Sequence, residues 1–358
     1  MAGAARGMAM RGEDGSWAVV ATVQEPAPLV AAFAAHWLAL GAEEVHLFLD
    51  EPSPEVEAAL TGRPGVRLVV CDAAFWATRR REGRPALVTG RQRFNANAVL
   101  REGRQAWLVH CDADEFLVPE AAIAGQLAML GPGVDFARIG VKERLWLRHS
   151  APQTIFDGVF RGPDPRDGTR REGLDPALRP CLNPHGMLGH AAGKSVVRRG
   201  AAVRMGIHFP EPQGPKLPPQ ALEAWRAERG GTIAGWLAHF DGLTPLHWVV
   251  KQLRKFAKHE RLHEGSGPLD LGPRTEDRKA QMRLVHGLRR DPAALRGLME
   301  ALMTVEAPGG AVVPGPGGLA DVARRRFPDL ALDFSVAGFD GHLRAAHAEL
   351  LAGMELAL

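Results

Sequence analysis

The stretch Ala106-Trp107-Leu108-Val109-His110-Cys111-Asp112-Ala113-Asp114-Glu115-Phe116-Leu117-Val118 decides how the chain is organised. Its apolar start is typical of a short buried strand, and acidic side chains follow that strand at once. Asp112 and Asp114 are two residues apart, so in an extended segment their side chains leave on the same side. Carboxylates this close repel each other unless a cation neutralises them. Oxygen ligands suit Mg²⁺ or Mn²⁺, whose other coordination positions can take the phosphate oxygens of a nucleotide diphosphate.

The alternative interpretation of this motif is a solvated acidic turn after a strand. A lone Asp-x-Asp favours that alternative, because short motifs match often by chance. Here a second apolar run, Phe116 to Val118, follows the acidic residues. Since a solvated turn rarely sits between two apolar runs, the context favours a ligand site outside the carboxyl end of the strand.

The N-terminal third alternates between strand and helix patterns. Strands are expected at 17–23, 45–49, 66–70 and 107–109, and helices at 28–40, 55–60 and 87–101. This order predicts an α/β fold with a mostly parallel sheet, right-handed crossovers and flanking helices.

Polar or acidic residues follow each expected strand. They are Glu25, Asp50, Asp72 and Asp112. A parallel sheet would place these strand ends along one edge, where Glu25 and Asp50 could contact a base or a ribose. Helix capping or turn formation explains Glu25 and Asp50 equally well at this point.

Composition limits the function classes. The 358 residues are 46% hydrophobic and 24% charged, as in ordinary globular proteins. A net charge of +3 with scattered arginines is no nucleic-acid footprint. The three cysteines are far apart, which argues against a zinc finger or disulfide framework and fits a reducing compartment. No apolar run approaches the length of a membrane span, and residues 1–15, which lack a signal core, are expected to be a disordered lead-in.

Several strings resemble a known family. They are Ala-Thr-Val-Gln-Glu-Pro at 21–26, His-Trp-Leu-Ala-Leu-Gly at 36–41, Leu-Asp at 49–50 and Asp-Ala-Asp-Glu-Phe at 112–116. Together they resemble the family 2-like glycosyltransferases of GT-A fold, in the Asp-x-Asp-Glu-Phe branch related to family 92. The usual Asn-Glu is here Gln24-Glu25, and the usual Asp-Asn-x-Ser is only partly kept at 50–53. The resemblance covers residues 17–265 and is strongest at 107–117.

The resemblance implies roles for named residues. Asp112 and Asp114 would bind the metal, Mn²⁺ or Mg²⁺, with His208 as third ligand. Nucleotide-sugar binding would involve Glu25, Asp50, Arg91, Arg93, Asp112, Lys194, His247 and Lys251. A satisfied structural histidine remains the alternative for His208, and exposed helix positions remain the alternative for Arg91 and Arg93.

A basic helix face is expected after residue 243. His247, Lys251, Lys258 and Arg261 are spaced at three, four or seven, so they fall near one face. Such a face could clamp a diphosphate, and a solvated amphipathic helix is the alternative. Between 161 and 180 a stretch rich in Pro, Gly, Arg and Asp predicts a loop over the substrate site.

We therefore predict a GT-A-like glycosyltransferase domain at 16–265 and a helical C-terminal extension at 266–358. It would move a sugar from a nucleotide-diphosphate donor to a carbohydrate or other hydroxyl acceptor, with inversion implied by the resemblance. An inverting reaction needs a carboxylate base, for which Glu115, Glu143 and Asp157 are candidates.

Two other functions stay open. One is a metal-dependent nucleotidyltransferase or phosphohydrolase that uses the same aspartates, and the other is a non-catalytic scaffold with the same fold. The expected location is cytoplasmic, with peripheral association at the inner face of the membrane as an alternative and with no nucleic-acid partner.

Overall fold

The computed structural model describes residues 15–165, 169–262, 271, 275–306, 312–352 and 354. The expected lead-in over residues 1–14 lies outside the described residues, and so does the side chain of Arg261.

The first half of the sheet is parallel. Its strands are β1 (Trp17–Val23), β2 (Glu44–Leu49), β3 (Val66–Val70) and β4 (Trp107–His110), in the spatial order β3-β2-β1-β4. The connecting helices are α1 (Ala27–Ala39), α2 (Pro54–Leu60), α3 (Ala73–Arg79) and α4 (Val88–Glu102). All of these elements except α3 were expected. The carboxyl ends of β1, β2 and β4 therefore share one edge, as predicted.

Successive side chains of β1 pack alternately into two hydrophobic clusters. Ala18 and Val20 pack in the cluster that also holds Ala96 and Val99 of α4. Trp17, Val19, Ala21 and Val23 pack in the main cluster with α1 on the opposite face. Every residue of β1 is buried, which explains its continuous apolar sequence.

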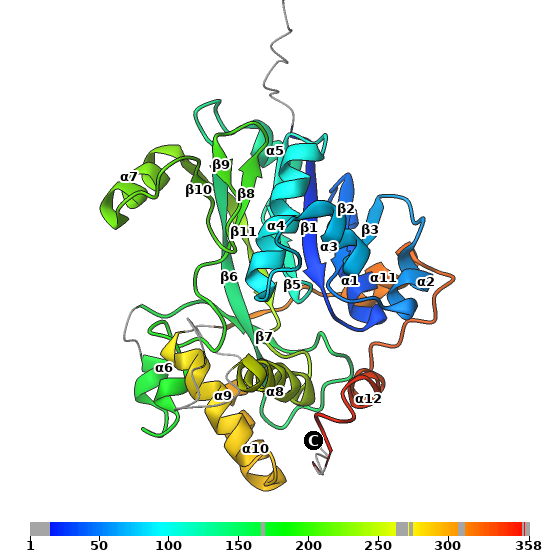
Figure 1. Cartoon of the computed structure of the whole chain (residues 1–358). Coiled ribbons are helices and arrows are strands. Elements are labelled where there is room, and N and C mark those ends of the chain that lie inside the picture. The colour runs from blue at the N-terminus through cyan, green and yellow to red at the C-terminus, as the bar shows by residue number, and fades with distance from the viewer. Residues whose placement is uncertain are drawn as a thin grey trace, which may run out of the picture.

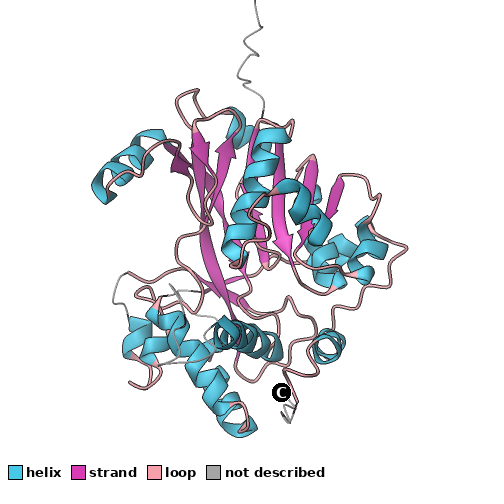
Figure 2. Ribbon diagram, viewed as in Figure 1, coloured by secondary structure: helices cyan, strands magenta, loops and turns pink. Residues whose placement is uncertain are grey.

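The second half of the sheet is mixed. β8 (Lys194–Arg198) runs antiparallel to β4 and β6 (Phe136–Leu147), and β6 also pairs antiparallel with β7 (Val159–Arg161). β11 (Gly230–His239) pairs parallel with β6 and antiparallel with β5 (Glu115–Pro119). β13 (Val312–Pro314) completes this edge. The predicted α/β class with flanking helices is confirmed (Figure 2), and the sheet is mixed because antiparallel strands join the parallel ones.

The remaining elements follow the sheet or cap it. They are α5 (Ile123–Ala128), α6 (Thr169–Glu172), η1 (Arg179–Cys181), β9 (Val203–Arg204), β10 (Glu211–Pro212), α7 (Pro219–Arg229), α8 (Pro245–Leu262), α9 (Glu276–Leu288), α10 (Pro292–Met303), β12 (Thr304–Val305), α11 (Leu319–Arg326) and α12 (Val336–Ala346). Figure 1 shows α8, α9 and α10 gathered at one end of the sheet. Leu295, Ala323 and Phe339 belong to the main hydrophobic cluster, so the predicted extension shares the core of the preceding residues. No helix in the described ranges is long and apolar enough to cross a membrane.

Candidate functional site

The acidic motif forms a closed turn between β4 and β5. The backbone N–H of Asp112 donates to Glu115 Oε2 at 2.9 Å, and the N–H of Glu115 donates to the carbonyl of Asp112 at 3.1 Å. Asp112 and Asp114 lie within this turn, at the edge where the parallel strands end. Glu115, the first residue of β5, therefore closes the turn with these two hydrogen bonds.

Lys194, at the start of β8, neutralises the first aspartate. Its Nζ donates to Asp112 Oδ2 at 2.6 Å and lies 3.4 Å from Glu115 Oε2, and its side chain is fully buried. Burial alone would lower the pKa of Lys194, but the Asp112 and Glu115 carboxylates outweigh burial and raise it. Burial alone would raise the pKa of Asp112, but the Lys194 ammonium holds it well below its usual range. Both groups are charged at neutral pH.

Lys251, in α8, neutralises the second aspartate. Its Nζ donates to Asp114 Oδ2 and, at 3.0 Å, to the backbone carbonyl of Asp241. Burial alone would lower the pKa of Lys251, but Asp114 and Asp241 raise it above its usual range. Each aspartate of the motif thus has an ammonium partner that is distant in sequence. This supplies the neutralising charge that the sequence argument assigned to a metal ion.

Glu25 and His247 join the end of β1 to α8. His247 accepts from the N–H of Leu243 at its Nδ1, so its Nε2 donates to Glu25 Oε2 at 3.1 Å. Burial would raise the pKa of Glu25, but His247 and Lys251 lower it to about 2. The carboxylate is therefore ionised, and it interacts electrostatically with Lys251, the partner of Asp114.

Asp50 and Arg91 form a buried pair at the end of β2. Arg91 Nε and Nη2 each donate to one oxygen of Asp50 at 2.5 Å. The next arginine on α4, Arg93, is exposed and lies 3.3 Å from Glu211. It lines a separate groove of about 270 Å³ together with Arg80, Arg101 and Arg204. Only Arg91 of the two predicted arginines reaches the edge where the strands end.

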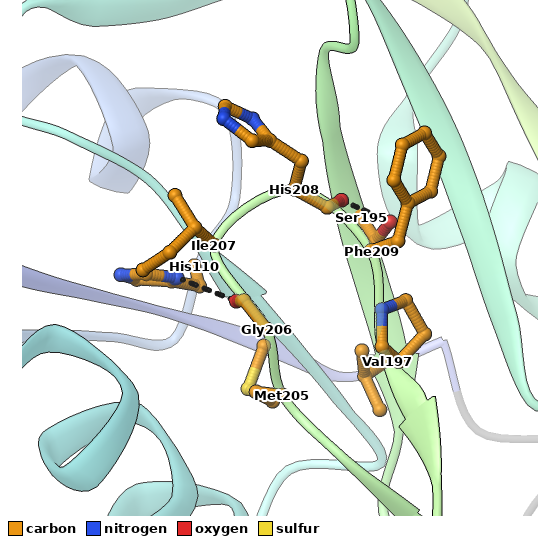
Figure 3. A pocket seen from close by; sticks show the side chains of 9 residues that line it. His110, Ser195, Val197, Met205, Gly206, Ile207, His208 and Phe209 are labelled. Carbon is orange, nitrogen blue, oxygen red and sulfur yellow. Dashed lines mark hydrogen bonds between the residues drawn. The ribbon is translucent and has the colours of Figure 1, made fainter. Parts of the chain in front are cut away.

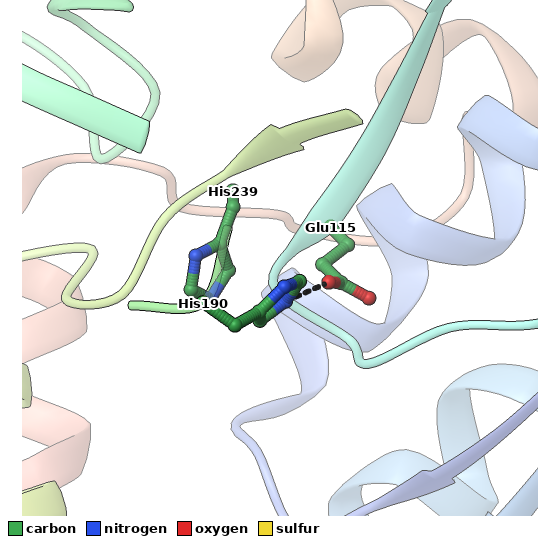
Figure 4. A group of neighbouring side chains, drawn as sticks. All are labelled: Glu115, His190 and His239. Atoms are coloured by element: carbon green, nitrogen blue, oxygen red, sulfur yellow. Dashed lines mark hydrogen bonds and ion pairs between the residues drawn. The ribbon is translucent and has the colours of Figure 1, made fainter. Parts of the chain in front are cut away.

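A histidine cluster adjoins the acidic turn (Figure 4). In the described part of the chain, one group of three His, Cys, Asp or Glu side chains brings a potential ligand atom from each within 4.8 Å of the others. Its members are Glu115, His190 and His239. His190 Nε2 lies 2.9 Å from Glu115 Oε1, and His239 stands opposite Glu115 across the β5–β11 pairing. Burial and the neighbouring His239 hold the pKa of His190 well below its usual range, so its ring is neutral at pH 7. A neutral imidazole is the form that binds metals.

His208 lies beside this cluster. Its ring centroid is 4.2 Å from that of His190, and its Nδ1 lies 3.0 Å from the carbonyl of Gly193. Two contacts fix the segment that carries His208 (Figure 3). Ser195 Oγ donates to the carbonyl of His208, and His110 Nδ1 lies 3.2 Å from the carbonyl of Gly206. Among the described residues, Asp112, Asp114 and His208 do not bring three ligand atoms within 4.8 Å of one another. That ligand set stays a prediction.

The three candidate bases have other contacts. Glu115 is buried in the cluster described above. Glu143 is also buried and accepts from the N–H of Leu188 at 3.1 Å and of Gly189 at 2.5 Å. Asp157 accepts from the N–H groups of Gln153 and Thr154, which closes a turn. These contacts give all three carboxylates structural roles, so the catalytic base stays unassigned.

Sequence reasoning did not find His190 and His239. A usable signal existed for His239, because the apolar run 236–238 is followed by His239 and Asp241 in the same way that 107–109 is followed by the acidic motif. His190 lies in a glycine-rich loop before β8, where spacing carries no signal.

Comparisons with known proteins give low similarity. No protein-family model and no curated protein matches the chain. Among solved structures, S. aureus TarS residues 1–349 is 11% identical over 88% of each chain, with a TM-score of 0.33, and the same values hold for its complex with UDP-GlcNAc. The mannosyltransferase Ktr4p from S. cerevisiae is 10% identical over 40% of this chain and 42% of that chain, with a TM-score of 0.23. Similarity of this size leaves the function to be inferred from the residues of the site.

Proposed function

We propose that this chain is a glycosyltransferase that uses a nucleotide-diphosphate sugar. The observation that supports this most is that Glu25, Asp50 and Asp112 follow three adjacent parallel strands, while Lys194 of β8 and Lys251 of α8 contact the acidic motif. Ligands of open α/β sheets bind outside the carboxyl ends of the strands. This edge combines carboxylates for a base or ribose with ammonium groups for a diphosphate.

The chemistry needs both kinds of group. Loss of the sugar leaves negative charge on the nucleotide diphosphate, and a lysine ammonium fixed in a dry site stabilises such charge. Lys194 and Lys251 are held in place by Asp112 and Asp114, so they cost little reorganisation when the charge develops. The carboxylates of Glu25 and Asp50 would accept hydrogen bonds from base N–H or ribose O–H groups.

The finer assignments rest on the sequence resemblance. They are the family 92-related branch, inversion at the sugar, a hydroxyl acceptor and dependence on Mn²⁺ or Mg²⁺. A divalent ion would act as a Lewis acid on the leaving diphosphate. A cytoplasmic location with peripheral membrane contact belongs to the same set of proposals.

Product analysis tests the proposal. The chain is incubated with each common sugar nucleotide, with and without Mn²⁺, and the nucleotide products are resolved. Glycosyl transfer, or slow hydrolysis without acceptor, gives nucleoside diphosphate. Lys251→Met should reduce that product at least about 100-fold, as loss of one transition-state donor does in other enzymes. Nucleoside monophosphate with sugar phosphate would instead identify a phosphohydrolase or nucleotidyltransferase, and no product with any donor would favour the scaffold.

A further inference from the structure

We propose that Glu115, His190 and His239 form a binding site for a divalent transition-metal ion, separate from the Asp112–Asp114 pair. The three side chains come from β5, the loop before β8 and the end of β11. They are the cluster defined above, with one ligand atom from each within 4.8 Å of the others. This inference stands whether or not the chain transfers sugars.

The charge around Glu115 favours a cation. Lys194 is shared by Asp112, at 2.6 Å, and Glu115, at 3.4 Å, so one ammonium faces two carboxylates. The two carboxylates of the Asp112–Glu115 pair therefore share a single ammonium group. Lys194 and the N–H of Asp112 face Oε2 of Glu115, while Oε1 faces His190.

The histidines have unused nitrogen atoms. In the described part of the chain, Nδ1 of His190 and Nδ1 of His239 are buried and have no hydrogen-bond partner. Buried polar atoms are rarely left without a hydrogen-bond partner. An ion bound to one nitrogen of each ring would fix the tautomer, and so would decide which nitrogen needs a hydrogen-bond partner. His239 is only 5% exposed, and Glu115 is fully buried. The two Nδ1 atoms are therefore shielded from the surface.

The donor set selects the class of ion. Two imidazoles and one carboxylate suit Zn²⁺, Co²⁺ or Fe²⁺, whereas Mg²⁺ prefers oxygen ligands only. Three protein ligands also leave coordination positions open, which is typical of metal sites that act on a substrate.

The test is a Co²⁺ titration of the metal-stripped chain without a histidine tag and without any sugar nucleotide. Binding is followed by the visible absorption of Co²⁺ and by competition with Zn²⁺ and with Mg²⁺. We expect one Co²⁺ per chain, displaced by Zn²⁺ and unaffected by an equal concentration of Mg²⁺. His190→Gln and His239→Gln should each weaken Co²⁺ binding more than about 100-fold, beyond the effect of replacing a residue that only hydrogen-bonds a ligand.

The matched controls are the residues of the other assignment. Asp114→Asn and His208→Gln should bind Co²⁺ as the wild type does. Thermal unfolding without metal checks that each variant is folded, and His190→Gln, in a loop, covers the case in which His239→Gln does not fold. The inference is overturned if the wild type binds no Co²⁺, if Mg²⁺ displaces it, or if Asp114→Asn abolishes binding while His190→Gln retains it.

Discussion

At the scale of single residues, Lys194 is the fully buried ammonium group that contacts the first carboxylate of the motif. Its buried ammonium faces Asp112 and Glu115. Lys194→Met keeps the length of the side chain but strands both carboxylates, so we expect a loss of about 3 kcal/mol in the free energy of unfolding. Urea denaturation measures this loss in the free energy of unfolding. Adding Asp112→Asn should restore part of the loss, because one stranded charge is then removed. Additive losses in the double variant would contradict this pairing.

At the scale of elements, the loop before β8 packs directly on β11. A Cβ at Gly189 would come within 2.6 Å of His239 Cε1 and 3.1 Å of Glu143 Oε2. Gly189→Ala should therefore cost about 1–3 kcal/mol in the free energy of unfolding, since the ring or the loop must move. Gly125→Ala, in exposed α5 with nothing within 4 Å, is the control and should be neutral or slightly stabilising. Equal denaturation midpoints for the two variants would show that the loop yields freely.

At the scale of the whole molecule, buried histidines set the response to acid. Burial lowers the pKa values of His36, His110 and His208 from 6.5 to about 4. Between these values the unfolded chain binds more protons than the folded one, so stability falls as the pH falls from 6.5 toward 4. Glu25, with its pKa lowered from 4.5 to about 2, adds its loss only below pH 4.5. Unfolding free energies measured at several pH values should decline across the first window, and His36→Gln should make the decline shallower. A flat profile would contradict neutral burial of these rings.

The parallel half of the fold could be predicted because its signals are local. Each strand from β1 to β4 is a short apolar run with a polar residue at its end, and each crossover helix has its own apolar spacing. β11 was missed because Gly230, Gly231 and Gly235 interrupt the pattern expected of a strand. The antiparallel pairing of β8 is likewise set by a partner far along the chain.

The site was predictable only in part, because its contacts also join segments that are far apart in the sequence. The acidic motif and the segments with Lys194, His247 and Lys251 were named from sequence, and the structure brings them together. Which groups pair was not predictable, because Lys194 and Asp112 are 82 residues apart and Lys251 and Asp114 are 137 apart. The argument from repelling aspartates omitted these lysines. It therefore considered a metal ion as the source of neutralising charge and left the two ammonium groups out; metal binding by Asp112 and Asp114 stays a prediction.

The hydrogen bonds from α9 to the loop that leads to His190 bear on the order in which the chain folds during synthesis. Gln281, fully buried, donates to the carbonyls of Cys181 and Leu188, the latter 93 residues earlier in the sequence. A ribosome completes β1, β2 and β4 long before it adds this glutamine. Chains fold from the N-terminal side during synthesis, so the edge where β1, β2 and β4 end can form early. The loop with His190 gains these two hydrogen bonds only when α9 has emerged, and a chain stopped at residue 265 would lack them.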